Sequence, residues 1–263
     1  MLKYVKSIGK DIETMRLIFV RHAEPDYEHN TLTQKGFREA ELLAPRAAGW
    51  NACRYFTSPL NRAKLTAAPA LSLLGREAEI VPWIQEFSYM VTDPVTGRVG
   101  VPWDFMPAYW TEQEELHDRH RFYRHPVLSS NPEYEPAVMA LRKGINEILA
   151  GYGLTRCGDY YRHDTAVNCD VTLAFFAHLG ANCEAIGYLL GISPLVLQQT
   201  LYLAPSSVSV LNSEERTKGE LMFRAQFIGD TSHLTSSGEP VSMMGSFSES
   251  ILQETPRKED TSL

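Results

Sequence analysis

The chain has 263 residues, of which 44% are hydrophobic and 22% charged, a composition typical of a globular protein with one substantial core. The formal net charge of −7 argues against a nucleic-acid partner, which needs a basic face. No apolar run approaches the roughly 20 residues of a membrane-spanning helix, and residues 1–14 lack the apolar centre of a signal peptide. The four cysteines have no metal-binding spacing, so we expect reduced thiols in a cytoplasmic protein.

Apolar runs alternate with helical patterns along the chain, which indicates an α/β fold. Residues 17–20 form a continuous apolar run that ends at Arg21 and His22, as expected of a strand buried on both faces of a parallel sheet. Thr33 is expected to cap the first helix, and Ser58 with Pro59 to begin the second. Further strands are expected over 55–57, 80–82, 171–177, 208–211 and 221–228, and further helices over 136–151 and 181–190 and after Pro194. The pattern predicts a three-layer α/β/α sandwich around a mostly parallel sheet.

Residues 88–133 interrupt this alternation with many aromatic residues and prolines. A segment so rich in aromatic residues is unlike a disordered linker, so we expect a cap insertion with a helix over 111–124. The prediction is one domain over 15–234, preceded by an extension (1–14) and followed by a flexible tail (235–263).

Ionisable side chains follow several of the predicted strands. Arg21 and His22 follow the first strand, and Arg62 falls on the first turn of the next helix. Glu86 and His178 come after two further strands. Because ligands bind at the carboxyl ends of such sheets, these five side chains are expected to meet at one rim.

This set of side chains suits phosphoryl transfer. Two guanidinium groups beside a helix N-terminus can hold a tetrahedral dianion. A neutral imidazole can attack phosphorus to form a phosphohistidine, and a protonated glutamate can give a proton to the leaving alcohol. Because arginine and histidine supply the positive charge, no metal or other cofactor is expected.

Several motifs resemble those of the histidine phosphatase (phosphoglycerate mutase-like) superfamily. They are residues 21–24, 58–67 and 178–180, and segments 32–36 and 229–234 are similar to bacterial members. The resemblance extends over most of the predicted domain but leaves the cap unmatched, and it implies the fold and a phosphoryl-transfer activity.

By this resemblance, His22 is the phosphorylated nucleophile, and Arg21 and Arg62 hold the phosphate. His178 is the second histidine of the pocket, and Glu86 is the proton donor.

The resemblance also implies phosphate contacts from Asn30 and Ser58. The chain departs from the family pattern at Ala23 and Leu179, where glycine is usual, and at Pro25, where a hydroxyl residue is usual. These departures bear on substrate and efficiency more than on reaction class.

Other acidic residues offer alternatives to these assignments. Glu24 or Asp104 could replace Glu86 as proton donor. Asp164, Asn168 and Asp170, close in sequence to His163, could suggest a metal or catalytic site, but we favour a polar approach to the buried strand.

The run 117–125 within the cap permits three interpretations. It could be a solvated helix surface whose basic end suits the helix dipole. His117 and His120, three residues apart on one helical face, could instead begin a metal site that His125 or Asp118 completes. Alternatively, a second anionic group of the substrate could be bound by its arginines, Arg119, Arg121 and Arg124.

The sequence thus predicts a phosphatase that hydrolyses a small phosphate monoester through phospho-His22, without a metal. A phosphoglycerate mutase-type transfer and a non-catalytic phospholigand-binding module are the alternatives. The expected partner is a small phosphorylated metabolite, with neither nucleic acid nor membrane. The sequence does not fix the oligomeric state, and the protein could form a dimer.

Overall fold

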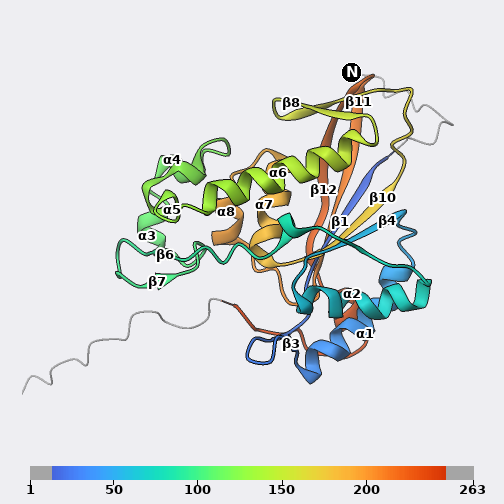
Figure 1. Cartoon of the computed structure of the whole chain (residues 1–263), viewed down its shortest axis with the longest axis horizontal. Helices are drawn as coiled ribbons and strands as arrows, with labels where there is room; N and C mark the ends of the chain where they lie inside the picture. Colours follow the sequence, from blue (N-terminus) through green and yellow to red (C-terminus); the bar gives the residue numbers. More distant parts are fainter. Residues whose placement is uncertain (1–13, 247–263) are drawn as a thin grey trace, which may run out of the picture.

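The computed structural model describes residues 14–246, and Figure 1 shows their arrangement around a large twisted sheet. The sheet has eight strands in the order β5 (Glu79–Ile80), β4 (Arg54–Thr57), β10 (Thr172–Ala177), β1 (Arg16–Arg21), β11 (Val208–Thr217), β12 (Glu220–Asp230), β9 (Tyr160–His163) and β8 (Leu154–Cys157). Strands β5, β4, β10 and β1 pair in parallel, and each of the remaining strands pairs antiparallel to its neighbours. The expected class, an α/β fold with a central sheet flanked by helices, is confirmed.

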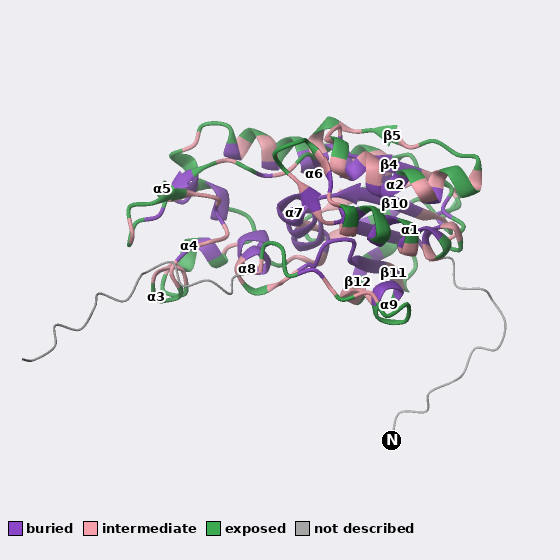
Figure 2. Cartoon of the chain, turned by 90° about the horizontal axis from the view of Figure 1, so that it is seen from below, coloured by how far each residue is buried: buried purple, intermediate pink, exposed green. Residues whose placement is uncertain are grey.

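Side chains of β1 alternate between two separate hydrophobic cores. Leu17 and Phe19 belong to the larger core, which α6 (Tyr134–Ala150) and α7 (Leu179–Leu190) cover. Ile18 and Val20 belong to the smaller core, which α1 (Gln34–Ala48) and α2 (Asn61–Leu74) cover. A strand with both faces buried reads as a continuous apolar run, which explains the pattern of 17–20. Figure 2 shows that the central strands and α7 are mostly buried, whereas α1, α2 and α6 also carry exposed residues.

The first two helices begin differently from one another. Thr33 caps α1 as predicted, because its hydroxyl accepts a hydrogen bond from the backbone N–H of Gly36. The prediction that Ser58 caps α2 is wrong, since the helix begins at Asn61 with Leu60 at the cap position. The Ser58 hydroxyl instead accepts a hydrogen bond from Leu60 N–H and lies 2.7 Å from Nε2 of His178. This serine therefore faces the neighbouring strand end.

The segment 88–133 lies beyond one end of the sheet (Figure 1). It consists of short elements, namely β6 (Val91–Thr92), β7 (Val99–Gly100), α3 (Pro107–Trp110), α4 (Glu114–His117), the 3-10 turn η2 (Phe122–Arg124) and α5 (Pro126–Ser129). Buried residues of this segment, including Phe105, Leu116 and Phe122, join the larger core.

The single helix predicted over 111–124 is wrong. The helix α4 ends at His117 because Asp118 is extended, with ψ at 105°, and its carboxylate accepts a hydrogen bond from His120 N–H. Aspartate competes in this way with helical hydrogen bonding, so the helix cannot continue.

The remaining elements are short or lie at the ends of the described chain. They are β2 (Pro25–Asp26), β3 (Thr31–Leu32), the 3-10 turn η1 (Pro82–Ile84), α8 (Pro194–Thr200) and α9 (Ser232–Thr235). The hairpin of β8 and β9 was not predicted from the sequence. Residues 1–13 of the predicted extension and residues 247–263 of the predicted tail lie outside the described residues.

All four cysteines lie within the described range and are free thiols, of which Cys169 and Cys183 are buried. Between residues 14 and 246, the structure contains no helix both long and apolar enough to cross a membrane.

Candidate active site

The carboxyl ends of three adjacent parallel strands lie side by side in the sheet. Arg21 on β1 pairs with Ala177 on β10, and Phe176 on β10 pairs with Thr57 on β4. The next residue of each strand is therefore His22, His178 or Ser58. Backbone hydrogen bonds continue past the strand ends, since the N–H groups of His22 and Ser58 donate to β10 carbonyls at 2.9 and 3.0 Å. The register thus places His22, His178 and Ser58 at one edge of the sheet.

His22 is buried and its ring is held in one tautomer. Nδ1 lies 2.8 Å from the carbonyl oxygen of Ala23, which can only accept a hydrogen bond, so Nδ1 carries the proton. Burial, followed by the nearby charge of Arg21 and then Arg62, holds the pKa of His22 well below its usual range. The neutral ring therefore keeps the lone pair of Nε2 for attack on an electrophile.

His178 is fully buried beside His22, with their ring centroids 5.1 Å apart. Desolvation and the positive surroundings lower the pKa of His178 well below its usual range. Its Nε2 lies 2.7 Å from the Ser58 hydroxyl. A second neutral imidazole thus faces the same space, where it can accept a proton once an anion is bound.

Arg21 and Arg62 bring the fixed positive charge. Arg21 is buried and one terminal nitrogen donates to the carbonyl oxygen of Leu203. Arg62 lies over the ring of Tyr27, with 5.4 Å between guanidinium carbon and ring centroid. The Nε atoms of both arginines are buried and have no hydrogen-bond partner among the described residues. Unpaired buried donors of this kind are expected where an anionic ligand completes the site.

Glu86 lies at the N-terminus of α7. Its Oε1 accepts hydrogen bonds from the N–H groups of Phe87 and Gly180, each at 2.9 Å, and of Ala181 at 3.3 Å. Burial raises the pKa of Glu86, and these backbone donors and the two arginines only partly oppose that effect. A Cβ at Gly180 would lie 2.8 Å from Oε1, so glycine permits this close approach. The raised pKa suits a carboxyl group that must carry a proton.

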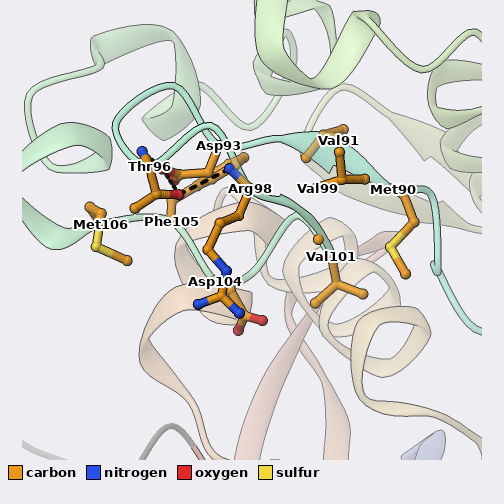
Figure 3. Close-up of a pocket in the computed structure, with 11 residues that line it drawn as sticks. Met90, Val91, Asp93, Thr96, Arg98, Val99, Val101, Asp104, Phe105 and Met106 are labelled. Carbon is orange, nitrogen blue, oxygen red and sulfur yellow. Dashed lines mark hydrogen bonds between the residues drawn. The ribbon is translucent and has the colours of Figure 1, made fainter. Parts of the chain in front are cut away.

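The two alternative proton donors are placed differently. Both carboxylate oxygens of Glu24 are already acceptors, one from the Thr33 hydroxyl at 2.9 Å and one from the Ser242 hydroxyl at 2.5 Å. Asp104 lines a cavity of about 340 Å³ within the cap, beside Arg98 (Figure 3). None of the five predicted catalytic side chains lines that cavity.

The other predicted substrate contacts are exposed side chains. Asn30 is exposed in the loop between β2 and β3, with a left-handed φ of 51°. The three arginines of the run 117–125 are exposed and pair with acidic residues, as Arg119 with Asp159, Arg121 with Asp118 and Arg124 with Glu135. These pairs connect parts of the cap to each other and to the rest of the chain.

Metal-binding clusters were a further alternative. Within residues 14–246, no group of three or more histidine, cysteine, aspartate or glutamate side chains has a geometry that could hold a metal ion. His163 is instead buried and paired with Glu215, its Nδ1 lying 2.9 Å from the carboxylate.

Sequence reasoning missed the loop that follows α8. Ser206 has a left-handed φ of 58°, and its N–H donates to the carbonyl oxygen of His22 at 3.1 Å. Strained non-glycine residues tend to lie at functional sites. The Ser206 hydroxyl also lies 3.0 Å from Nε2 of His233, which falls in one of the motifs behind the resemblance. Paired serines at 206–207 carry no signal that would have marked them in advance.

Comparison with known proteins connects this rim to a family. The sequence model of the histidine phosphatase superfamily (branch 1) matches residues 17–99, which include His22, Arg62 and Glu86. A comparison with curated protein sequences gives no significant match.

Solved structures resemble the chain over most of its length. A mycobacterial glucosyl-3-phosphoglycerate phosphatase matches with a TM-score of 0.54 and 16% identity, covering 82% of this chain and 99% of its own. A phosphoserine phosphatase mutant from Entamoeba histolytica in complex with phosphoserine matches with a TM-score of 0.52 and 17% identity, covering 84% and 99%. A structure described as mycobacterial hydrolase 1 matches with a TM-score of 0.54 and 14% identity, covering 82% and 99%. At these identities the similarity establishes the fold, and the fold predicted from the motifs is confirmed.

Proposed function

We propose that this chain, whose residues 17–99 match the histidine phosphatase superfamily, hydrolyses a small phosphate monoester through a phosphohistidine at His22. One observation carries the proposal. The Nδ1 atom of His22 is engaged by the Ala23 carbonyl, so the neutral ring keeps Nε2 free within the electrostatic field of Arg21 and Arg62. A buried nucleophile held neutral beside fixed positive charge is suited to attack on a phosphorus atom.

In the first step, Nε2 of His22 forms a bond to phosphorus while the bond from phosphorus to the substrate oxygen breaks. Phosphorylation gives the ring a positive charge, which the Ala23 carbonyl stabilises through Nδ1–H. Arg21 and Arg62 bind the non-bridging oxygens. Because Oε1 of Glu86 already accepts three backbone hydrogen bonds, the acidic proton resides on Oε2, from which it passes to the leaving alcohol.

In the second step, water attacks phosphorus and the bond to Nε2 breaks. The ionised Glu86 takes a proton from that water, which restores the starting state and releases inorganic phosphate. The arginines supply positive charge throughout, so the reaction is expected to proceed without a metal ion.

The leaving alcohol is expected to face the cap. The ring of Trp103 reaches the first turn of α7, where a Cβ at Gly180 would lie 2.7 Å from it and 2.8 Å from the Glu86 carboxylate. An aromatic wall beside the proton donor suits a small organic group. Two structural neighbours were solved with phosphoserine and with 3-phosphoglyceric acid, so both compounds belong in a first substrate panel.

The test is to incubate the protein with each monoester of the panel and to measure the free phosphate and the organic product. A chelator is included to remove metal ions. Release of phosphate and alcohol in equal amounts supports the proposal. An isomerised phosphoester formed without phosphate release would favour the mutase alternative instead. That alternative requires water to be excluded between the two transfers.

A further inference from the structure

Residues 239–245, close to the end of the described chain, pass beside Arg21 and have no role in the proposed reaction steps. We call them the strap. Figure 1 shows this end of the chain returning to the region of β3 and α1, close to the carboxyl ends of the central strands. Its base is fixed by Glu239, which pairs with Lys35 at 2.9 Å and with Arg38 at 3.2 Å, both on α1.

The middle of the strap is fastened to the segment that follows His22. Ser242 is buried, and its hydroxyl donates to the Glu24 carboxylate at 2.5 Å. The Tyr202 hydroxyl donates to the Ser242 carbonyl oxygen at 2.6 Å. Glu24 thus uses its second oxygen to hold the strap, and not to serve as a free acid.

The end of the strap reaches the catalytic guanidinium itself. One terminal nitrogen of Arg21 donates to the Met244 carbonyl oxygen at 3.4 Å, while the other donates to Leu203. Gly245 follows with a left-handed φ of 75°, and a Cβ there would lie 3.1 Å from the same nitrogen of Arg21. Any other residue at 245 would be strained and would crowd the guanidinium.

Donor geometry indicates whether this contact blocks or positions Arg21. Each carbonyl takes one hydrogen of a different terminal nitrogen, which leaves Nε–H and the second hydrogen of each terminal nitrogen for a ligand. The buried Nε has no partner among the described residues. The guanidinium of Arg21 can therefore still bind a phosphate through two hydrogen bonds. The carbonyl groups of Leu203 and Met244 fix the orientation of the guanidinium plane.

We propose that the strap positions Arg21 for phosphate, with Ser242, Glu24 and Tyr202 as positioning residues. The proposal rests on the proposed function in that Arg21 is taken to bind the phosphate. Because the Met244 contact is long, loss of the strap should weaken phosphate binding by about tenfold and not abolish it.

The test measures the dissociation constant of inorganic phosphate by calorimetry for the full-length protein. Ser242→Ala, Tyr202→Phe and Gly245→Ala should each weaken binding by about tenfold. Met243→Ala is the matched control, because that side chain is 64% exposed and its removal leaves the strap backbone in place. Phosphate binding that is unchanged or tighter in all three variants would overturn the proposal, and tighter binding would point to a blocking role.

A double-mutant cycle separates positioning from general stabilisation. In an Arg21→Lys background, Ser242→Ala should cause no further loss of phosphate affinity, since the strap acts through the guanidinium. An equal loss in both backgrounds would overturn the proposal. The readout is independent of turnover, so a wild type that binds phosphate but hydrolyses no monoester would contradict the proposed function alone.

Discussion

His22 and His178 face each other with ring centroids 5.1 Å apart, at the ends of two parallel strands, and burial favours the neutral form of both rings. The fixed positive charge that acts on both rings therefore comes from Arg21 and Arg62. Because the histidines are neutral and the arginines are charged, the two kinds of side chain can have different roles. One imidazole can act as a nucleophile, while the arginines hold the dianion that it attacks.

Arg62→Ala should lower kcat/KM by about a thousandfold or more and weaken inhibition by inorganic phosphate. Arg62 lies on the first turn of α2, and its buried Nε lacks a partner among the described residues, so a ligand is its expected acceptor. Steady-state kinetics with phosphate as a competitive inhibitor make the measurement. Activity within a few-fold of wild type would show that the pocket has been assigned to the wrong residues.

Glu86→Gln should lower kcat by about 10²–10⁴-fold for an alkyl phosphate and much less for an aryl phosphate with an acidic leaving group. Glutamine keeps a carbonyl oxygen for the three backbone donors but cannot release a proton. Asp104→Asn is the comparison, because Asp104 lines the cap cavity. If Asp104→Asn showed the leaving-group dependence and Glu86→Gln did not, the proton donor would be Asp104.

The pH profile of kcat/KM should have two limbs set by these groups. Attack needs neutral His22, whose pKa is lowered, so activity is lost as pH falls through that value. Proton donation needs protonated Glu86, whose pKa is raised, so activity is lost as pH rises through it. In Glu86→Gln the alkaline limb should disappear while the acidic limb stays. An alkaline limb that survives the substitution would assign it to another group.

Arg142→Ala should destabilise the fold by about 3 kcal/mol, because it leaves Glu184 buried without its partner. Burial already raises the pKa of Glu184 from 4.5 to about 7, so the folded state binds this proton more tightly than the unfolded state. The contribution of Glu184 to the free energy of unfolding therefore falls as pH rises between those values. The fall is larger without Arg142, because the positive charge that favours ionised Glu184 is then missing. Urea unfolding should show a larger loss at pH 8 than at pH 6, and an equal loss would contradict this account.

The central layers of the fold could be predicted because their signals are local. The apolar run 17–20 and the strand 172–177 are buried on both faces, and Thr33 caps its helix through its own side chain. The prediction over 111–124 failed at Asp118, where a single side-chain hydrogen bond to the backbone outweighs the helical pattern. The residue types alone do not reveal which bond forms.

The site was predictable where side chains lie at a strand end or on the first turn of the helix that follows it. The rim residues Arg21, His22 and His178 follow from the register of two parallel strands. The contacts of Arg21 with the backbone carbonyls of Leu203 and Met244 could not be predicted. Every residue has a backbone carbonyl, so the residue type does not mark the acceptor, and both acceptors lie some 180 to 220 residues further along the chain. The motif that contains Ser58 predicts a phosphate contact for this residue. Its contact with His178 could not be predicted, because that contact depends on how β4 and β10 pair in the sheet.

The most direct test of the central claim is to trap the phosphoenzyme. A ³²P-labelled monoester that the protein turns over is mixed with wild type and with His22→Ala, and the reaction is quenched within milliseconds in alkaline detergent, in which phosphohistidine survives. We predict label on wild type that maps to His22, and none on His22→Ala. A wild type that hydrolyses the monoester without labelled protein, or a label retained in His22→Ala, would contradict the claim. A wild type that binds phosphate tightly but neither labels nor turns over would favour the binding module.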